Sequence, residues 1–197
     1  MKYFIDFDRT IFDTNSFKKT LERRPTVVEL VAQFKNVWKE FWSLSESHLQ
    51  RRLFRASLGA FLSNGRFLFV PADLKEFLYP DALAFFERYG EDCTIVTYGI
   101  RAFITAKVTS ALTDISIHDV VYTGRRKGRT IQRLCAEEKD QCTFIDDAHF
   151  QLASVTRRCP NITVIEMRRD SQPGDGRWPV IHSFDELVNS SYEKSHC

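Results

Sequence analysis

The stretch that decides the fold is YFIDFDRT, residues 3–10. It opens with a short apolar run, Tyr3 to Ile5, and continues into two acidic residues, Asp6 and Asp8. Apolar runs without clean polar alternation are typical of strands whose two faces are both covered by helices in a parallel sheet. Similar β-branched or aromatic runs recur at 93–96, 120–122, 142–145 and 162–165.

Helix-like stretches separate these runs. Residues 81–89 place Ala82, Leu83 and Phe86 on one face and stop at Gly90. Further helices are expected at 102–112, 130–139 and 150–158. Strands that alternate with helices over such short connections predict right-handed βαβ units and a three-layer α/β sandwich around a parallel sheet.

One long stretch, residues 15–79, breaks the alternation of strands and helices. It carries an apolar stripe from Val27 to Trp42 at three- and four-residue spacing, and a second stripe from Leu49 to Leu62. Two such helices joined by a short polar turn would form an antiparallel hairpin. We therefore predict an all-helical insertion at 15–79 in a core formed by residues 1–14 and 80–197.

Composition limits the partners. The 197 residues are 43% hydrophobic and 27% charged, as in ordinary globular proteins, and the net charge of +2 is spread along the chain. This distribution lacks the basic stripe of a nucleic-acid binder, and no apolar run is long enough to span a bilayer.

The five cysteines form no CxxC pair, which favours reduced thiols in a cytoplasmic protein. The chain runs directly into a strand-like segment, so no signal peptide is expected. A monomer or homodimer is expected.

Chemistry-bearing residues stand where the predicted strands end. Ligands of open α/β sheets bind at the carboxyl ends of the strands, so residues at these ends are expected to converge on one edge. In chain order the ends carry Asp6, Asp8 and Thr10, then Thr97, Tyr98 and Gly99, then Lys127, and finally Asp146 and Asp147.

This set resembles the motifs of the haloacid dehalogenase-like hydrolases over nearly the whole chain. The family's DxDx(T/V) motif matches Asp6, Asp8 and Thr10, and its strand-end Ser or Thr matches Thr97. The lysine motif matches Lys127, and the acidic fourth motif matches the pair that follows Ile145, residues 146–147. The resemblance implies a Rossmann-like core, and the insertion looks like the cap of the family's helical-cap branch. Arg9 departs from the pattern, because a small or apolar residue often stands there.

The resemblance implies a magnesium-dependent phosphatase that acts on a small phosphorylated metabolite. Asp6 would attack phosphorus, and Asp8 would protonate the leaving oxygen and then activate water. Lys127 would neutralise charge on the nucleophile and the phosphoryl group. Thr97, with backbone N–H groups of the Tyr98-Gly99 turn, would bind phosphoryl oxygens.

The implied metal site is made of oxygen ligands, as Mg²⁺ prefers. Asp146 and Asp147 would hold the ion beside Asp6 and the carbonyl group of Asp8. Which of the two later aspartates is the direct ligand stays open.

Several alternatives stay open at this point. Arg126 and Lys107 compete with Lys127 for the lysine role. Phosphotransfer to another acceptor would share the aspartyl-phosphate, and a non-catalytic binding module could keep the same fold. A dehalogenase is disfavoured, because a halide leaving group needs no general acid such as Asp8. Phosphonate cleavage would require a Schiff-base lysine, for which Lys18, Lys19, Lys35 and Lys39 are available.

Overall fold

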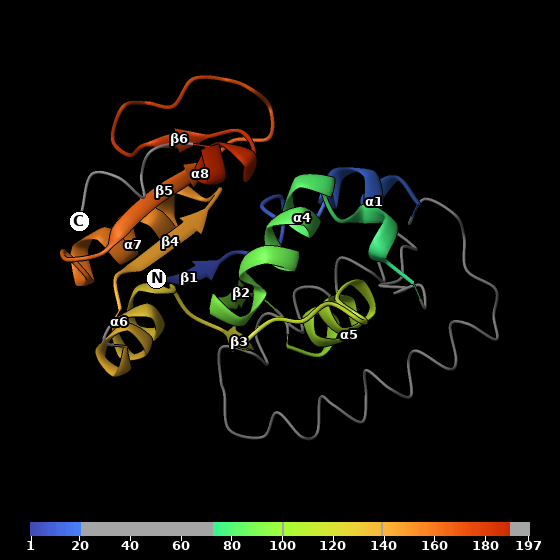
Figure 1. Cartoon of the computed structure of the whole chain (residues 1–197), viewed down its shortest axis with the longest axis horizontal. Helices are drawn as coiled ribbons and strands as arrows, with labels where there is room; N and C mark the ends of the chain where they lie inside the picture. The colour runs from blue at the N-terminus through green and yellow to red at the C-terminus, as the bar shows by residue number, and fades with distance from the viewer. Residues whose placement is uncertain (21–72, 100, 139, 190–197) are drawn as a thin grey trace, which may run out of the picture.

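The computed structural model describes residues 1–20, 73–99, 101–138 and 140–189 (Figure 1). The predicted helical cap at 15–79 therefore lies mostly outside the described residues, and so do both apolar stripes that predict it.

A sheet of six parallel strands, in the order β3-β2-β1-β4-β5-β6, forms the centre of the fold. All five predicted strands are present. β6 was not predicted, because its two residues are too few to show a period. The strands are β1 (Lys2–Ile5), β2 (Cys93–Tyr98), β3 (Asp119–Thr123), β4 (Cys142–Asp146), β5 (Thr163–Met167) and β6 (Val180–Ile181).

Helices cover both faces of the sheet, which confirms the predicted three-layer α/β architecture (Figure 1). Side chains of α4, α5 and α8 pack in the core on one face, and those of α6 and α7 pack on the other. The helices are α1 (Thr14–Thr20), α4 (Pro80–Tyr89), α5 (Arg101–Ala111), α6 (Gly128–Glu137), α7 (His149–Arg158) and α8 (Asp185–Asn189), with the short 3-10 turns η1 (Lys75–Phe77) and η2 (Gly90–Asp92).

β1 occupies the position that matters most for a site. It lies between β2 and β4, with Ile5 opposite Ile95 on one side and Ile145 on the other. The strand order runs outward from β1 in both directions, through β2 to β3 on one side and through β4 and β5 to β6 on the other. The order therefore reverses at β1, and a crevice is expected at its carboxyl end. The residues that follow β1, β2 and β4 consequently meet at one edge.

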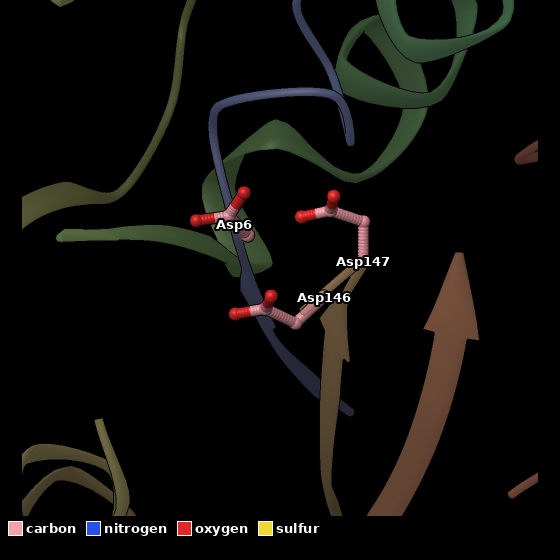
Figure 2. Close-up of side chains that lie close together, drawn as sticks. All are labelled: Asp6, Asp146 and Asp147. Carbon is pink, nitrogen blue, oxygen red and sulfur yellow. The ribbon is translucent and has the colours of Figure 1, made fainter. Parts of the chain in front are cut away.

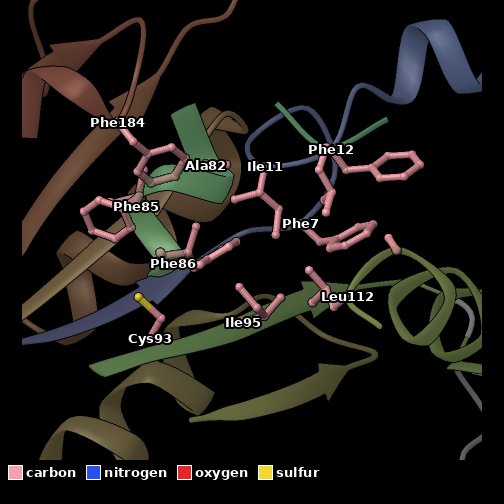
Figure 3. Close-up of a cluster of buried hydrophobic side chains, with 14 of the residues drawn as sticks. Phe7, Ile11, Phe12, Ala82, Phe85, Phe86, Cys93, Ile95, Leu112 and Phe184 are labelled. Carbon is pink, nitrogen blue, oxygen red and sulfur yellow. The ribbon is translucent and has the colours of Figure 1, made fainter. Parts of the chain in front are cut away.

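Aromatic packing anchors the loop that follows β1 (Figure 3). The rings of Phe7 and Phe12 stack with their centroids 5.0 Å apart, and Phe17 of α1 meets Phe12 edge-on at 5.4 Å. All three side chains are almost completely buried. Offset and edge-on ring pairs of this kind restrict the loop more than their buried area alone would.

The described cysteines Cys93, Cys135, Cys142 and Cys159 are free thiols, as the sequence predicts. In the portion of the chain that the structure describes, no helix is both long enough and apolar enough to cross a lipid bilayer.

Candidate active site

Three carboxyl groups, those of Asp6, Asp146 and Asp147, lie close together at the ends of β1 and β4 (Figure 2). One oxygen from each lies within 4.8 Å of the others. Because Ile5 and Ile145 are register partners on neighbouring strands, the residues that follow them reach the same edge. The sequence prediction that these acidic residues converge is therefore met in space, and an all-oxygen donor set of this kind fits Mg²⁺.

Lys127 lies buried between two of these carboxylates. Its Nζ donates to Oδ2 of Asp146 at 2.6 Å and to Oδ1 of Asp6. The residue is 1% exposed, and its backbone N–H donates to Oε1 of Gln151 on α7 at 2.8 Å. Arg126, one of its rivals, is exposed. Lys127 is therefore the candidate lysine that contacts both Asp6 and Asp146.

The start of α6 fixes this position through close packing. Gly128 follows Lys127 directly, and a Cβ atom there would lie 2.3 Å from the backbone carbonyl oxygen of Ser154. Only glycine therefore permits α6 to begin this close to α7.

Asp8 is held through a single oxygen. Its Oδ1 accepts a hydrogen bond from Thr14 Oγ at 2.5 Å and another from Lys107 Nζ. Its side chain is 35% exposed, and no hydrogen bond from the residues in the described ranges reaches its Oδ2. Lys107, the other rival for the lysine role, therefore contacts Asp8 and not Asp6. Thr14 was not predicted, and nothing in its local sequence singles it out.

The three residues predicted to bind phosphate differ in burial and in hydrogen bonding. Thr97 is 1% exposed, and its Oγ has no hydrogen-bond partner within the described part of the chain. The N–H of Gly99 donates to the carbonyl of Thr123 at 3.3 Å, so it already has an acceptor. Gly99 is required by its backbone, because its φ is +150° and a Cβ would lie 2.4 Å from Ile104. Tyr98 is 37% exposed on the rim.

The family model for haloacid dehalogenase-like hydrolases matches residues 3–149, a range that contains every site residue predicted from the sequence. The chain belongs to this family. No curated protein sequence matches it.

Solved structures of haloacid dehalogenase-like hydrolases share the fold. A crystal structure of a dehalogenase is 14% identical, with a TM-score of 0.61 and 94% of each chain covered. L-2-haloacid dehalogenase from Xanthobacter autotrophicus, with chloropropionic acid covalently bound, is 16% identical, with a TM-score of 0.55 over 94% of this chain and 96% of that one. Magnesium-bound YfnB from Bacillus subtilis, described as a HAD-hydrolase, is 16% identical, with a TM-score of 0.56 over 95% and 96%. At these identities the likeness shows the fold alone.

Burial sets the protonation of the acidic cluster in this haloacid dehalogenase-like hydrolase. It raises the pKa of Asp6 to about 7, although the Lys127 ammonium acts in the opposite direction. Burial, with the charge of Asp6, also raises the pKa of Asp147 to about 6. Burial alone would lower the pKa of Lys127, but the carboxylates of Asp146 and Asp6 raise it. Further positive charge would favour the ionised carboxylates, and a bound divalent cation would supply it.

Arg9, the residue at which the chain departs from the family pattern, forms an ion pair with Asp147 of the acidic cluster. Its guanidinium Nη2 lies 2.9 Å from Oδ2 of Asp147, while the side chain is 56% exposed. Its φ of 60° lies in the left-handed region, which an arginine seldom adopts. Arg9 and Asp147 also line a cavity of about 710 Å³, together with Lys19, Tyr79 and His149 among others. The lining carries charges of both signs.

We expect Lys127→Met to lower the free energy of unfolding by about 3–5 kcal/mol, because Asp6 and Asp146 would stay buried without their cation. The control is Lys2→Met, which removes the partly exposed ion pair with Asp92 and should cost less than about 1 kcal/mol. Denaturant titration of both variants at neutral pH measures the difference. Equal, small losses would contradict the prediction.

Proposed function

We propose that the chain is a magnesium-dependent phosphatase that hydrolyses a small phosphomonoester through an aspartyl-phosphate on Asp6. The observation that carries the proposal is the contrast between two acids on one loop. Asp6 is buried against Lys127, while Asp8 is 35% exposed and keeps one carboxyl oxygen open. A nucleophile and an acid–base residue need such different surroundings.

In the first step, a carboxylate oxygen of Asp6 bonds to phosphorus as the bond from phosphorus to the leaving oxygen breaks. Asp8 gives its proton to that leaving oxygen. Lys127, in contact with Asp6, offsets the charge that gathers on the nucleophile and the phosphoryl oxygens. In the second step, water attacks phosphorus, Asp8 takes the water proton, and the bond from phosphorus to Asp6 breaks to release inorganic phosphate.

Thr97 supports a phosphoryl ligand in particular. A buried hydroxyl without a partner costs free energy, and a ligand oxygen that accepts its proton would remove that cost. Thr97 is the last residue but one of β2, the strand next to β1, so its hydroxyl would approach the phosphoryl group from the side opposite Asp146.

Asp6, Asp147 and the backbone carbonyl of Asp8 would hold Mg²⁺, which supplies positive charge beside the phosphoryl group. Asp147 is the better direct ligand of the acid pair. Asp146 already accepts from Lys127 at 2.6 Å with one oxygen and from the N–H of Ala148 at 2.8 Å with the other. Asp146 would then act mainly by positioning Lys127.

We expect Asp147→Asn to weaken Mg²⁺ binding at least about tenfold, because a charged ligand is lost. Isothermal titration calorimetry with MgCl₂ measures this directly. Asp119→Asn is the control, because Asp119 is exposed at the amino end of the edge strand β3, away from the carboxyl ends. Equal affinities for the two variants would remove Asp147 from the metal site.

The function is tested by phosphate release from an aryl phosphate and from a panel of metabolite phosphates, with Mg²⁺ and with EDTA. We expect release only with the metal. Chloride release from a 2-haloacid, measured in parallel, tests dehalogenation, which Asp8 disfavours because halide leaves without a proton. Release from no phosphate ester despite bound Mg²⁺ would favour a binding module.

A further inference from the structure

Lys107 occupies an unusual place for a charged side chain. It lies on α5, is 2% exposed, and points its ammonium group at three phenylalanine rings. The distances from Nζ to the ring centroids are 5.2 Å for Phe7, 4.3 Å for Phe12 and 5.4 Å for Phe17. Ring faces attract cations at these distances, so the aromatic cage fixes where the ammonium sits.

Among the described residues, the ion-pair partner of Lys107 is Asp8. Nζ donates to Oδ1 of Asp8, and Asp6 and Lys18 act on the ammonium only from further away. A buried ion pair often stabilises a fold less than a hydrophobic residue of the same size would, because both charges lose water. A methionine would fill the same aromatic cage without that cost. The charge of Lys107 therefore needs a reason other than packing.

The geometry offers a reason for the charge of Lys107: it orients the carboxyl group of Asp8. Lys107 and Thr14 both donate to Oδ1 of Asp8, from two different helices. Two donors on one oxygen define the rotamer of the side chain and leave the other oxygen, Oδ2, directed away from both.

We propose that Lys107 is a positioning residue for Asp8, which fixes Oδ1 so that Oδ2 is the atom that exchanges protons with the leaving oxygen and with water. The inference rests on the phosphatase function proposed above. The proton leaves Oδ2 for the leaving oxygen in the first step and is replaced by the proton of the attacking water in the second. Lys107 itself neither gains nor loses a proton and does not touch the substrate.

Lys107→Met tests the proposal, with leaving-group acidity as the readout. We measure kcat/KM for dinitrophenyl, nitrophenyl and phenyl phosphate, because kcat/KM reports the step in which the leaving oxygen departs. We expect a loss of about 10- to 100-fold for phenyl phosphate, whose oxygen needs the proton, and less than about threefold for dinitrophenyl phosphate. Equal losses for all three esters, or none, would overturn the proposal.

Stability separates positioning from a merely structural role. The denaturation midpoint of Lys107→Met should equal or exceed that of the wild type, because the carboxylate left without its cation, that of Asp8, is 35% exposed and can be solvated. Lys75→Met, an exposed lysine in η1, serves as the control and should leave both rates and stability unchanged. In an Asp8→Asn background, Lys107→Met should cause little further loss, and full additivity would contradict the proposal.

Two outcomes distinguish this inference from the proposed function. If the wild type hydrolyses the esters and Asp6→Asn does not, the proposed function stands. An equal loss of kcat/KM in Lys107→Met for all three esters would then refute the positioning role alone. A crystal structure of Lys107→Met gives a test independent of turnover. We expect a changed Asp8 rotamer, and an Asp8 that keeps its Oδ1 on Thr14 unaltered would refute the positioning role.

Discussion

Asp6→Asn is expected to lower turnover of aryl phosphates by more than about 1,000-fold, because an amide cannot attack phosphorus and no aspartyl-phosphate can form. Asp6 is 6% exposed where β1 ends. Steady-state rates at saturating Mg²⁺ measure the loss.

The fold should survive this substitution. Asparagine has nearly the same shape, and Lys127 keeps its hydrogen bond to Asp146 at 2.6 Å. Circular dichroism and the denaturation midpoint check that the variant is folded. Asp119→Asn, the same exposed control, should retain full turnover.

The covalent intermediate provides the decisive measurement for Asp6. Acid quenching of the wild type during turnover, followed by mass spectrometry, should find a phosphoryl group on the peptide that contains Asp6. The Asp6→Asn variant should lack it. A phosphoryl group on a different peptide, or turnover that persists in the variant, would refute the assigned nucleophile.

Asp8→Asn is expected to lower turnover by about 10²- to 10⁴-fold, the range typical of general acid–base residues. An amide can neither protonate the leaving oxygen nor accept the proton of water. With dinitrophenyl phosphate, which needs no protonation, the first step should continue and the second should stall. Asp8→Asn should therefore accumulate phosphoenzyme, which acid quenching and a burst of released dinitrophenol both measure.

Mg²⁺ binding gives the control for Asp8. The metal would use only the backbone carbonyl of this residue, so Asp8→Asn should bind Mg²⁺ with nearly wild-type affinity by calorimetry. A large loss of affinity would mean that the side chain holds the ion. Unchanged turnover would show that the acid–base assignment is wrong.

Much of the core could be predicted from the sequence because its signals are local. Buried parallel strands need continuous apolar runs, and the five predicted runs became β1 to β5 with ends that differ by at most two residues. The four predicted helices α4 to α7 likewise begin and end within two residues of expectation. β6, of two residues, and α8, of five, were missed because neither spans enough turns or alternations to show a period.

The strand-end rule also predicted the acidic cluster. Asp6 follows β1 directly, Asp146 ends β4 and Asp147 comes next, so their convergence requires only that the strands be parallel neighbours. The order of strands in the sheet was not predicted, because it depends on how the helices pack.

The sequence by itself determined a parallel α/β core with Asp6, Asp8, Thr97 and an acidic pair at one edge, since short-range periodicity and strand ends carry that information. Only the tertiary structure decided which lysine meets which aspartate. Lys127 reaches Asp6 across 121 positions, and Lys107 reaches Asp8 across 99. Contacts over such separations depend on strand order and helix packing, because β1 lies between β2 and β4 and brings α5 and α6 to the same loop. The chemistry assigned to the two aspartates follows from that packing.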